Sequence, residues 1–174
     1  MFRRLSPAIA VLFLSSVAVF AQGGAKPTDP QIAHIAYTAG QIDIEAAQQA
    51  LKMSKNKDVI AFAQGMVKDH TAVNKQALDL CTKLKVKPED NPTSQALTKQ
   101  AADKRAELAK LSGAAFDKAY MENEIAYHKT VNNALETTLI PAAQNAELKS
   151  LLQTGLKIFQ GHEQHAEHTA GMIK

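Results

Sequence analysis

The stretch DVIAFAQGMVKDHTAVNKQALDLCTKLK, residues 58–85, has the repeat of a long amphipathic helix. Steps of three and four residues along it select one stripe: Val59, Ala63, Met66, His70, Val73, Ala77, Leu80 and Leu84. Apolar residues at this spacing line one face of an α-helix and predict that the face packs into a core. One member of the stripe, His70, is polar, so a histidine occupies a position that the pattern assigns to the protein interior.

The rest of the chain predicts further helices of the same kind. The first runs from Pro30 to about Met53, with Asp29 as its N-cap. Later helices are expected over 94–111, over 114–139 with Pro141 ending it, and over 146–173 with Asn145 as its cap. No stretch alternates with a period of two, so the predicted fold class is all-α. Four long helices and a weakly amphipathic crossover within 86–113 predict a four-helix bundle.

The N-terminus has the composition of a secretory signal peptide over residues 1–21. Arg3 and Arg4 precede an apolar run, and Ala21 ends a cleavage signal of small residues. An uncleaved N-terminal anchor is the alternative. Residues 22–29 then form a flexible leader and 30–174 the bundle domain. No later segment approaches the ~20 apolar residues of a spanning helix. We therefore expect a periplasmic or secreted protein without a transmembrane span in the mature chain; association with the outer membrane stays open.

Charge and composition exclude several partners. The formal net charge is +3, and loss of Arg3 and Arg4 with the signal peptide would leave +1. A nearly neutral chain has no electrostatic attraction for nucleic acid. Aromatic residues make up 5% of the chain and tryptophan is absent, which argues against stacking platforms for bases or sugars. Cys81 is the only cysteine, so no internal disulfide can form, and we expect a buried thiol. Protein partners are not indicated.

Two other predicted helices repeat the anomaly of His70. His128 and His162 each fall on the apolar side of their helix, and Glu45 lies at the edge of the stripe of the first helix. At a rise of ~1.5 Å per residue, Glu45 and His162 lie ~15 Å, His70 ~18 Å and His128 ~21 Å from the same end of the bundle. The four side chains are therefore predicted to share one layer near mid-height.

Three imidazoles and a carboxylate in one layer suit a single transition-metal ion such as zinc, copper or iron. The alternative is a set of core histidines that bond to neighbouring hydroxyls or carbonyls, since buried polar groups need partners. Glu124 shares the face of His128 and is either a further ligand or an orienting residue. Asp69 points away from the face of His70 and is expected at the surface or as an orienting residue. His165 and His168 are expected at a solvated helix end.

Four segments carry a resemblance to a known family. The sequence resembles a bacterial exported family of unknown function, often labelled "predicted outer membrane protein", whose members adopt a ferritin-like four-helix bundle. The matching segments are GQIDIE (40–45), FAQGMVKDHTAVN (62–74), SGAAFDKAYMENEIAYH (112–128) and FQGHEQHA (159–166). The resemblance implies the ferritin-like fold, whereas the biochemical role of the family is unsettled.

The sequence departs from the di-iron proteins of ferritin-like fold. Those proteins carry Glu-x-x-His on two helices, but Val67 stands three residues before His70, and the spacing at His128 is Glu-x-x-x-His. Ferroxidase, oxygenase and iron-storage roles are therefore not supported. Three functions remain open. The first is a periplasmic protein that binds one metal ion for buffering or stress protection, and the second is a structural or interaction module of the cell envelope. The third is an enzyme, although no nucleophile–base pair indicates a reaction.

Overall fold

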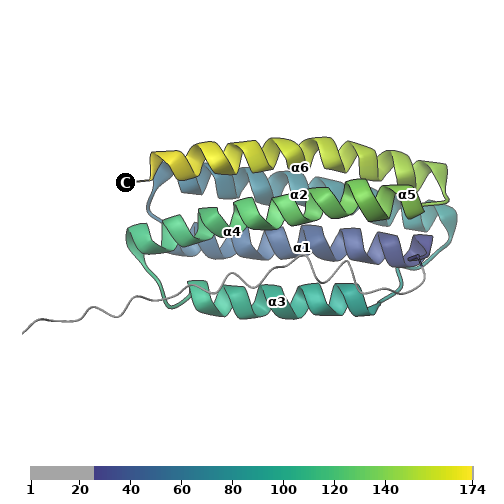
Figure 1. The fold of residues 1–174 in the computed structure, drawn as a ribbon, viewed down its shortest axis with the longest axis horizontal. Coiled ribbons are helices and arrows are strands. Elements are labelled where there is room, and N and C mark those ends of the chain that lie inside the picture. Colours follow the sequence, from purple (N-terminus) through teal and green to yellow (C-terminus); the bar gives the residue numbers. More distant parts are fainter. Residues whose placement is uncertain (1–25, 174) are drawn as a thin grey trace, which may run out of the picture.

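The computed structural model describes residues 26–173, and these form helices joined by short loops, with no strand among them (Figure 1). The all-α prediction is confirmed. The predicted signal peptide, 1–21, and half of the leader, 22–25, lie outside the described residues. The helices, in chain order, are α1 (Asp29–Met53), α2 (Lys57–Leu84), α3 (Pro92–Leu108), α4 (Gly113–Ala134), the π-helix η2 (Leu135–Leu139), α5 (Ile140–Ala142) and α6 (Ala146–Met172).

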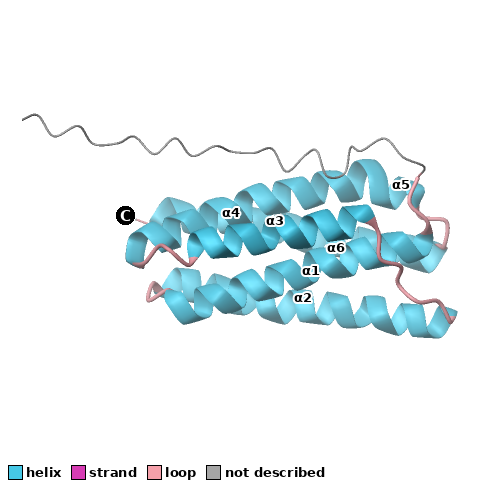
Figure 2. Ribbon diagram, turned by 90° about the horizontal axis from the view of Figure 1, so that it is seen from below, coloured by secondary structure: helices cyan, strands magenta, loops and turns pink. Residues whose placement is uncertain are grey.

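The long helices α1, α2, α4 and α6 lie side by side along the long axis of the molecule. The helices form two pairs, α1 with α2 and α4 with α6. The two pairs contact each other mainly through α2 and α6. Helix α3 lies outside this group against α1 and carries the chain back along the molecule (Figures 1 and 2). As a result, α2 and α4 run in the same direction, as the predicted crossover at 86–113 requires.

Local polar contacts explain where the helices begin. The side chains of Asn56 and Asn145 cap α2 and α6 by accepting hydrogen bonds from two backbone N–H groups each. The prediction that Asp29 caps α1 is wrong, because Thr28 is the N-cap. The Asp29 carboxylate instead accepts hydrogen bonds from the backbone N–H groups of Gln144 and Asn145, each at 2.8 Å, and so joins the start of α1 to the start of α6.

The end of α4 differs from the prediction. The helix does not stay regular up to Pro141: it passes into the π-helical turn η2 and the short α5, and helical structure ends at Ala142, one residue after Pro141. Proline in a regular helix clashes with the carbonyl of the residue four positions earlier. The wider turn, in which the N–H of Ile140 bonds to the carbonyl of Leu135, relieves this restriction and lets the chain continue.

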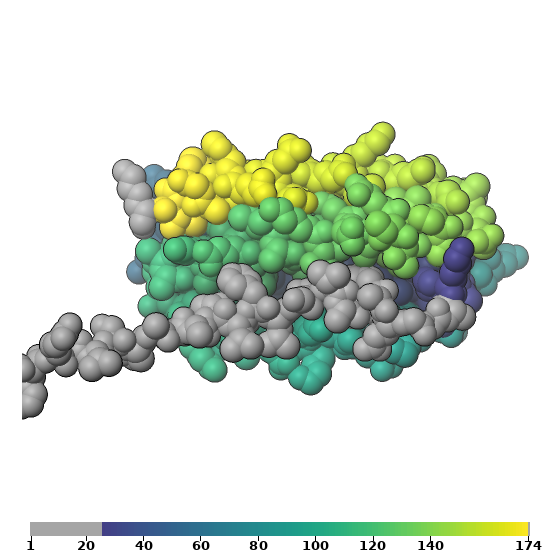
Figure 3. Space-filling view, viewed as in Figure 1, coloured from purple at the N-terminus to yellow at the C-terminus, as the bar shows by residue number. Residues whose placement is uncertain are grey.

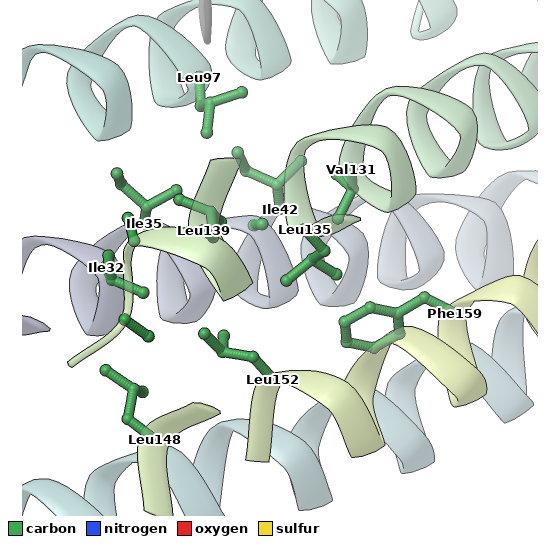
Figure 4. Packing of buried hydrophobic residues seen from close by; sticks show 13 residues of the cluster. Ile32, Ile35, Ile42, Leu97, Val131, Leu135, Leu139, Leu148, Leu152 and Phe159 are labelled. Carbon is green, nitrogen blue, oxygen red and sulfur yellow. The ribbon is translucent and has the colours of Figure 1, made fainter. Parts of the chain in front are cut away.

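The apolar core has two parts with a polar layer between them. One cluster (Figure 4) joins the first half of α1 to η2 and the first half of α6, and includes Ile35, Leu135 and Leu152. The other joins the second half of α1 to the first halves of α2 and α4. In α4 the second cluster ends at Met121 and the first begins at Val131. The residues between these two positions include the layer described below.

Four large hydrophobic side chains are exposed on the described residues. The exposed large hydrophobic residues, Leu78, Val86, Leu111 and Met172, belong to four separate segments. Figure 3 shows the side chains of α4 and α6 packed together on one face.

Within the described range, no helix is both long enough and apolar enough to cross a membrane.

Candidate metal centre

Three helices each place one histidine in the polar layer. His70 comes from α2, His128 from α4 and His162 from α6, and one ring nitrogen of each lies within 4.8 Å of one from the others. Their exposed fractions are 2%, 1% and 8%, so His162 forms the edge of the layer nearest to solvent. The sequence prediction that these three histidines share a layer agrees with this geometry.

The ring of His128 has one nitrogen engaged and one free. Nδ1 lies 2.9 Å from the backbone carbonyl oxygen of Glu124 and donates a hydrogen bond to it. The proton on Nδ1 leaves Nε2 as a neutral acceptor, and this atom is buried with no hydrogen-bond partner among the described residues. Burial lowers the pKa of His128 to about 4, although its hydrogen bond to the Glu124 carbonyl acts in the opposite direction. The imidazole is therefore neutral near pH 7 and can act as a ligand.

His162 has the same arrangement with its two nitrogens exchanged. Its Nε2 donates a hydrogen bond to Oδ2 of Asp69 at 3.1 Å, and its buried Nδ1 has no partner in the described part of the chain. A carboxylate that holds one ring nitrogen fixes the tautomer and makes the other nitrogen a better metal ligand. Asp69 projects sideways from α2 to reach α6, so the prediction of an orienting role fits its position. Burial lowers the pKa of His162, and Asp69 opposes this shift.

His70 lies at the centre of the layer. Its ring stacks on that of Phe159, with the centroids 4.7 Å apart and the planes 6° from parallel. The rings of His128 and His162 lie 5.9 and 5.1 Å away. Oδ2 of Asp43 is 3.5 Å from Nε2 of His70, and neither nitrogen of this ring has a hydrogen-bond partner within residues 26–173. Burial and the two neighbouring histidines lower the pKa of His70, which keeps it neutral.

Two buried carboxyl groups complete the layer. Asp43 of α1 and Glu124 of α4 are 2% and 1% exposed, and together with His128 they offer a second set of ligand atoms within 4.8 Å of one another. Burial raises the pKa of Glu124 to about 8. Burial, followed by the charge of Glu124, raises the pKa of Asp43 well above its usual range. Without a cation, the two groups retain protons that exposed carboxyl groups would lose.

Glu45, the carboxylate predicted for the first helix, lies elsewhere. Its side chain is 41% exposed and forms an ion pair of 2.8 Å with Arg105 of α3. The carboxylate that α1 contributes to the layer is Asp43, two residues earlier. Helix α1 is covered by α3 as well as by the other long helices, so it buries more than one face. Glu45 was predicted from a single apolar stripe along α1. One stripe does not describe all the buried positions of a helix that is covered on more than one face.

A signal for Asp43 was present in the sequence. It lies four residues after Ala39 and three before Ala46, within a second stripe of small residues that continues to Ala50, and all of these are buried. His165 and His168 are exposed, as predicted, and lie outside the layer. Glu124 lies within it, on the same face as His128, as its spacing indicated.

The layer contains many polar atoms without partners. Within the described residues, unpartnered buried atoms occur on Asp43, His70, Glu124, His128 and His162. An unsatisfied buried polar group costs roughly 1–3 kcal/mol, and such groups are few in native proteins. Five residues of one layer with this deficit fit a group that accepts electron pairs, and their ligand atoms form two sets that share His128: one with His70 and His162, the other with Asp43 and Glu124. A divalent cation is such a group, and two ionised carboxylates would balance its charge.

Fold and site together define a class: an all-helical protein whose long helices enclose a layer of histidine and carboxyl side chains. Residues 15–169 match the family described as "Domain of unknown function (DUF4142)", and the chain belongs to this family. This agrees with the predicted membership of a family of unknown function. The search of curated proteins and the search of solved structures gave no match.

Proposed function

We propose that this protein binds one transition-metal ion between α2, α4 and α6, with His70, His128 and His162 as ligands. The observation that carries the proposal is that the two nitrogens of a single histidine ring have different environments. In His128 and in His162, one nitrogen is held by a protein acceptor and the other is buried and unpartnered. Metal-binding histidines have this arrangement because the held nitrogen fixes the tautomer.

The donor set favours zinc, copper or iron. Neutral imidazole suits these ions, whereas magnesium and calcium prefer sites built from oxygen. Three imidazoles leave further coordination positions for a carboxylate oxygen of Asp43 or Glu124, or for an added ligand. Both carboxylates, once ionised, would balance the two positive charges of a divalent ion. Glu45 is not part of this proposal.

We further propose the setting in which the site works. The four long helices form a four-helix bundle of ferritin-like type with α3 as the crossover, a proposal supported by their mutual packing and by the parallel course of α2 and α4. The N-terminal composition supports export to the periplasm, where a single bound ion would serve metal buffering or stress protection.

Element analysis and thermal unfolding test the proposal together. Protein purified without an affinity tag is expected to contain about one equivalent of zinc, copper or iron. Adding zinc, copper or iron back to chelator-treated protein is expected to raise Tm, because a ligand that binds only the folded state stabilises that state. His70→Ala should abolish this rise, whereas His168→Ala, which changes an exposed histidine, should keep it.

Two results would overturn the proposal. Protein without metal whose Tm is unchanged by all three ions would leave the layer as a buried hydrogen-bonded network in a structural module. Equal loss of the Tm rise in the His70→Ala and His168→Ala proteins would show that the ion binds elsewhere.

A further inference from the structure

A cavity of about 40 Å³ lies beside the histidine layer, in the first of the two apolar clusters. Its walls come from α1, α2, α4, η2 and α6, and include Ala39, Val73, Ala134, Leu152 and Phe159. Figure 4 shows Leu135, Leu152 and Phe159 converging on this part of the interior. Protein interiors are close-packed, and voids larger than a water molecule are few. A cavity of this size is therefore unusual in a protein core.

The walls determine what kind of molecule fits. Among the described residues that line the cavity, Asn74 alone is polar, and its Nδ2 already donates a hydrogen bond to the Tyr37 carbonyl. A water molecule in a protein interior needs two to four polar partners. A single side-chain amide does not supply them, and within residues 26–173 no charged side chain lines the cavity to hold an ion. Walls of this kind favour small apolar molecules, including xenon, over water.

Phe159 forms the boundary between this cavity and the histidines. Its ring is part of the cavity wall, and the same ring stacks on His70 at 4.7 Å. Gly155, one turn earlier in α6, also lines the cavity, and a Cβ there would lie 3.4 Å from the Phe159 ring. Val73 and Val131 continue the same wall, one turn beyond His70 and His128 respectively. A molecule in the cavity would therefore lie one aromatic ring away from the proposed centre.

We propose that this cavity binds a small, uncharged, apolar molecule of the size of dioxygen or xenon, and that the Phe159 ring separates the bound molecule from His70. Binding in the cavity follows from its walls alone. Its relevance to the metal centre rests on the proposed function, since an ion with an open coordination position could meet such a molecule when the ring moves.

Xenon tests the binding site in metal-free protein. Methyl resonances of Val73, Leu135 and Leu152 should shift with xenon pressure and reach a plateau, whereas those of the exposed Leu78 should not. Ala134→Leu places a larger side chain at the cavity wall and should remove the shifts. Ala126→Leu, an exposed position of the same helix, should retain them.

Xenon shifts that are absent or never saturate in the unaltered protein would overturn the proposal, whether or not Ala134→Leu folds. Saturable shifts that persist in folded Ala134→Leu protein would place the xenon elsewhere and would also overturn it. Because no metal is present, neither result bears on the proposed ion site, which the metal titration tests separately.

Substitution of Phe159 tests the boundary. In Phe159→Ala protein, the ring resonances of His70 should move with xenon pressure, and they should stay still in the unaltered protein. Phe159→Leu keeps an apolar side chain at the boundary and provides a second, milder opening should the alanine variant not fold. His70 resonances that respond to xenon equally in the unaltered and substituted proteins would refute a separating role for this ring.

Discussion

At the scale of single residues, His128 and His162 each have one ring nitrogen held by a protein acceptor, the Glu124 carbonyl and the Asp69 carboxylate respectively. The contact of His162 with Asp69 is the clearest case, because it joins two helices and fixes the tautomer of the ring. Asp69 is itself 41% exposed, so it can be replaced without opening the core. Its contribution to metal binding can therefore be measured apart from its contribution to packing.

Asp69→Asn should weaken metal binding by roughly 10–100-fold, the usual effect of losing such an orienting carboxylate. Asp79→Asn is the matched control, because Asp79 is an exposed aspartate of the same helix that pairs with Lys75. Competition with a coloured chelator would give both affinities. Equal affinities for the two variants would mean that Asp69 does not act through His162.

The two buried carboxyl groups predict an unusual pH dependence. Burial raises the pKa of Glu124 from 4.5 to about 8, so the folded, metal-free protein keeps a proton that the unfolded chain has lost. The free energy of unfolding must then fall as pH rises from about 4.5 to 8. The lowered pKa of His128, about 4 instead of 6.5, has the opposite sign and acts only below about pH 6.5. Between pH 6.5 and 8 the carboxyl effect remains alone.

Metal-free protein should therefore lose stability between pH 6.5 and 8, and Glu124→Gln should make this loss smaller. Urea unfolding at several pH values would measure it. Glu122→Gln, an exposed position of the same helix, should leave the slope unchanged. A bound divalent ion should also remove the decline, because its charge favours ionised carboxylates. A slope that is the same in Glu124→Gln and unaltered protein would contradict the raised pKa.

At the scale of the helices, one glycine sets how closely α1 approaches α2. A Cβ at Gly40 would lie 2.4 Å from Oδ1 of Asn74, a buried residue whose Nδ2 bonds to the carbonyl of Tyr37. Asn74 is enclosed by the two helices and cannot turn aside without losing that bond. Helix α1 therefore requires glycine here for a close contact, although glycine weakens an isolated helix.

Gly40→Ala should lower the free energy of unfolding by about 1–3 kcal/mol, the range for an overpacked core. Gly65→Ala provides the control, since a Cβ there meets nothing within 4 Å, and alanine in a helix interior should instead add roughly 0.5–1 kcal/mol. Chemical denaturation of both variants would show the opposite signs. Similar stabilities would mean that the α1–α2 contact tolerates a methyl group.

At the scale of the whole molecule, the polar layer separates the two apolar clusters of the core. Without an ion, the helices around this layer enclose buried polar atoms that have no hydrogen-bond partner, and a bound ion would link those helices. Stripping the ion with a chelator should lower Tm. At a free ion concentration 100 times the dissociation constant, binding adds about 2.7 kcal/mol, which corresponds to roughly 5–11 °C in Tm for a domain of this size. Calorimetry with and without chelator would measure it. An unchanged Tm would count against an ion that links the helices.

The sequence by itself determined the all-α class, the order of the long helices, the cap Asn145 as a local signal, and the inward position of three histidines. These features depend on residues three or four apart, which lie on one face of a helix wherever that helix packs. His70, His128 and His162 were therefore found without knowledge of their neighbours.

Only the tertiary structure decided which carboxylates join the histidines and which remain outside. Asp43 lies in the layer and Glu45 pairs with Arg105 because α3 covers a second face of α1, a contact between segments far apart in the chain. The reach of Asp69 to His162, the π-helical turn before Pro141 and the cavity beside Phe159 likewise depend on how neighbouring helices pack. Periodicity along one helix carries no information about the helix beside it, so these features required the assembled molecule.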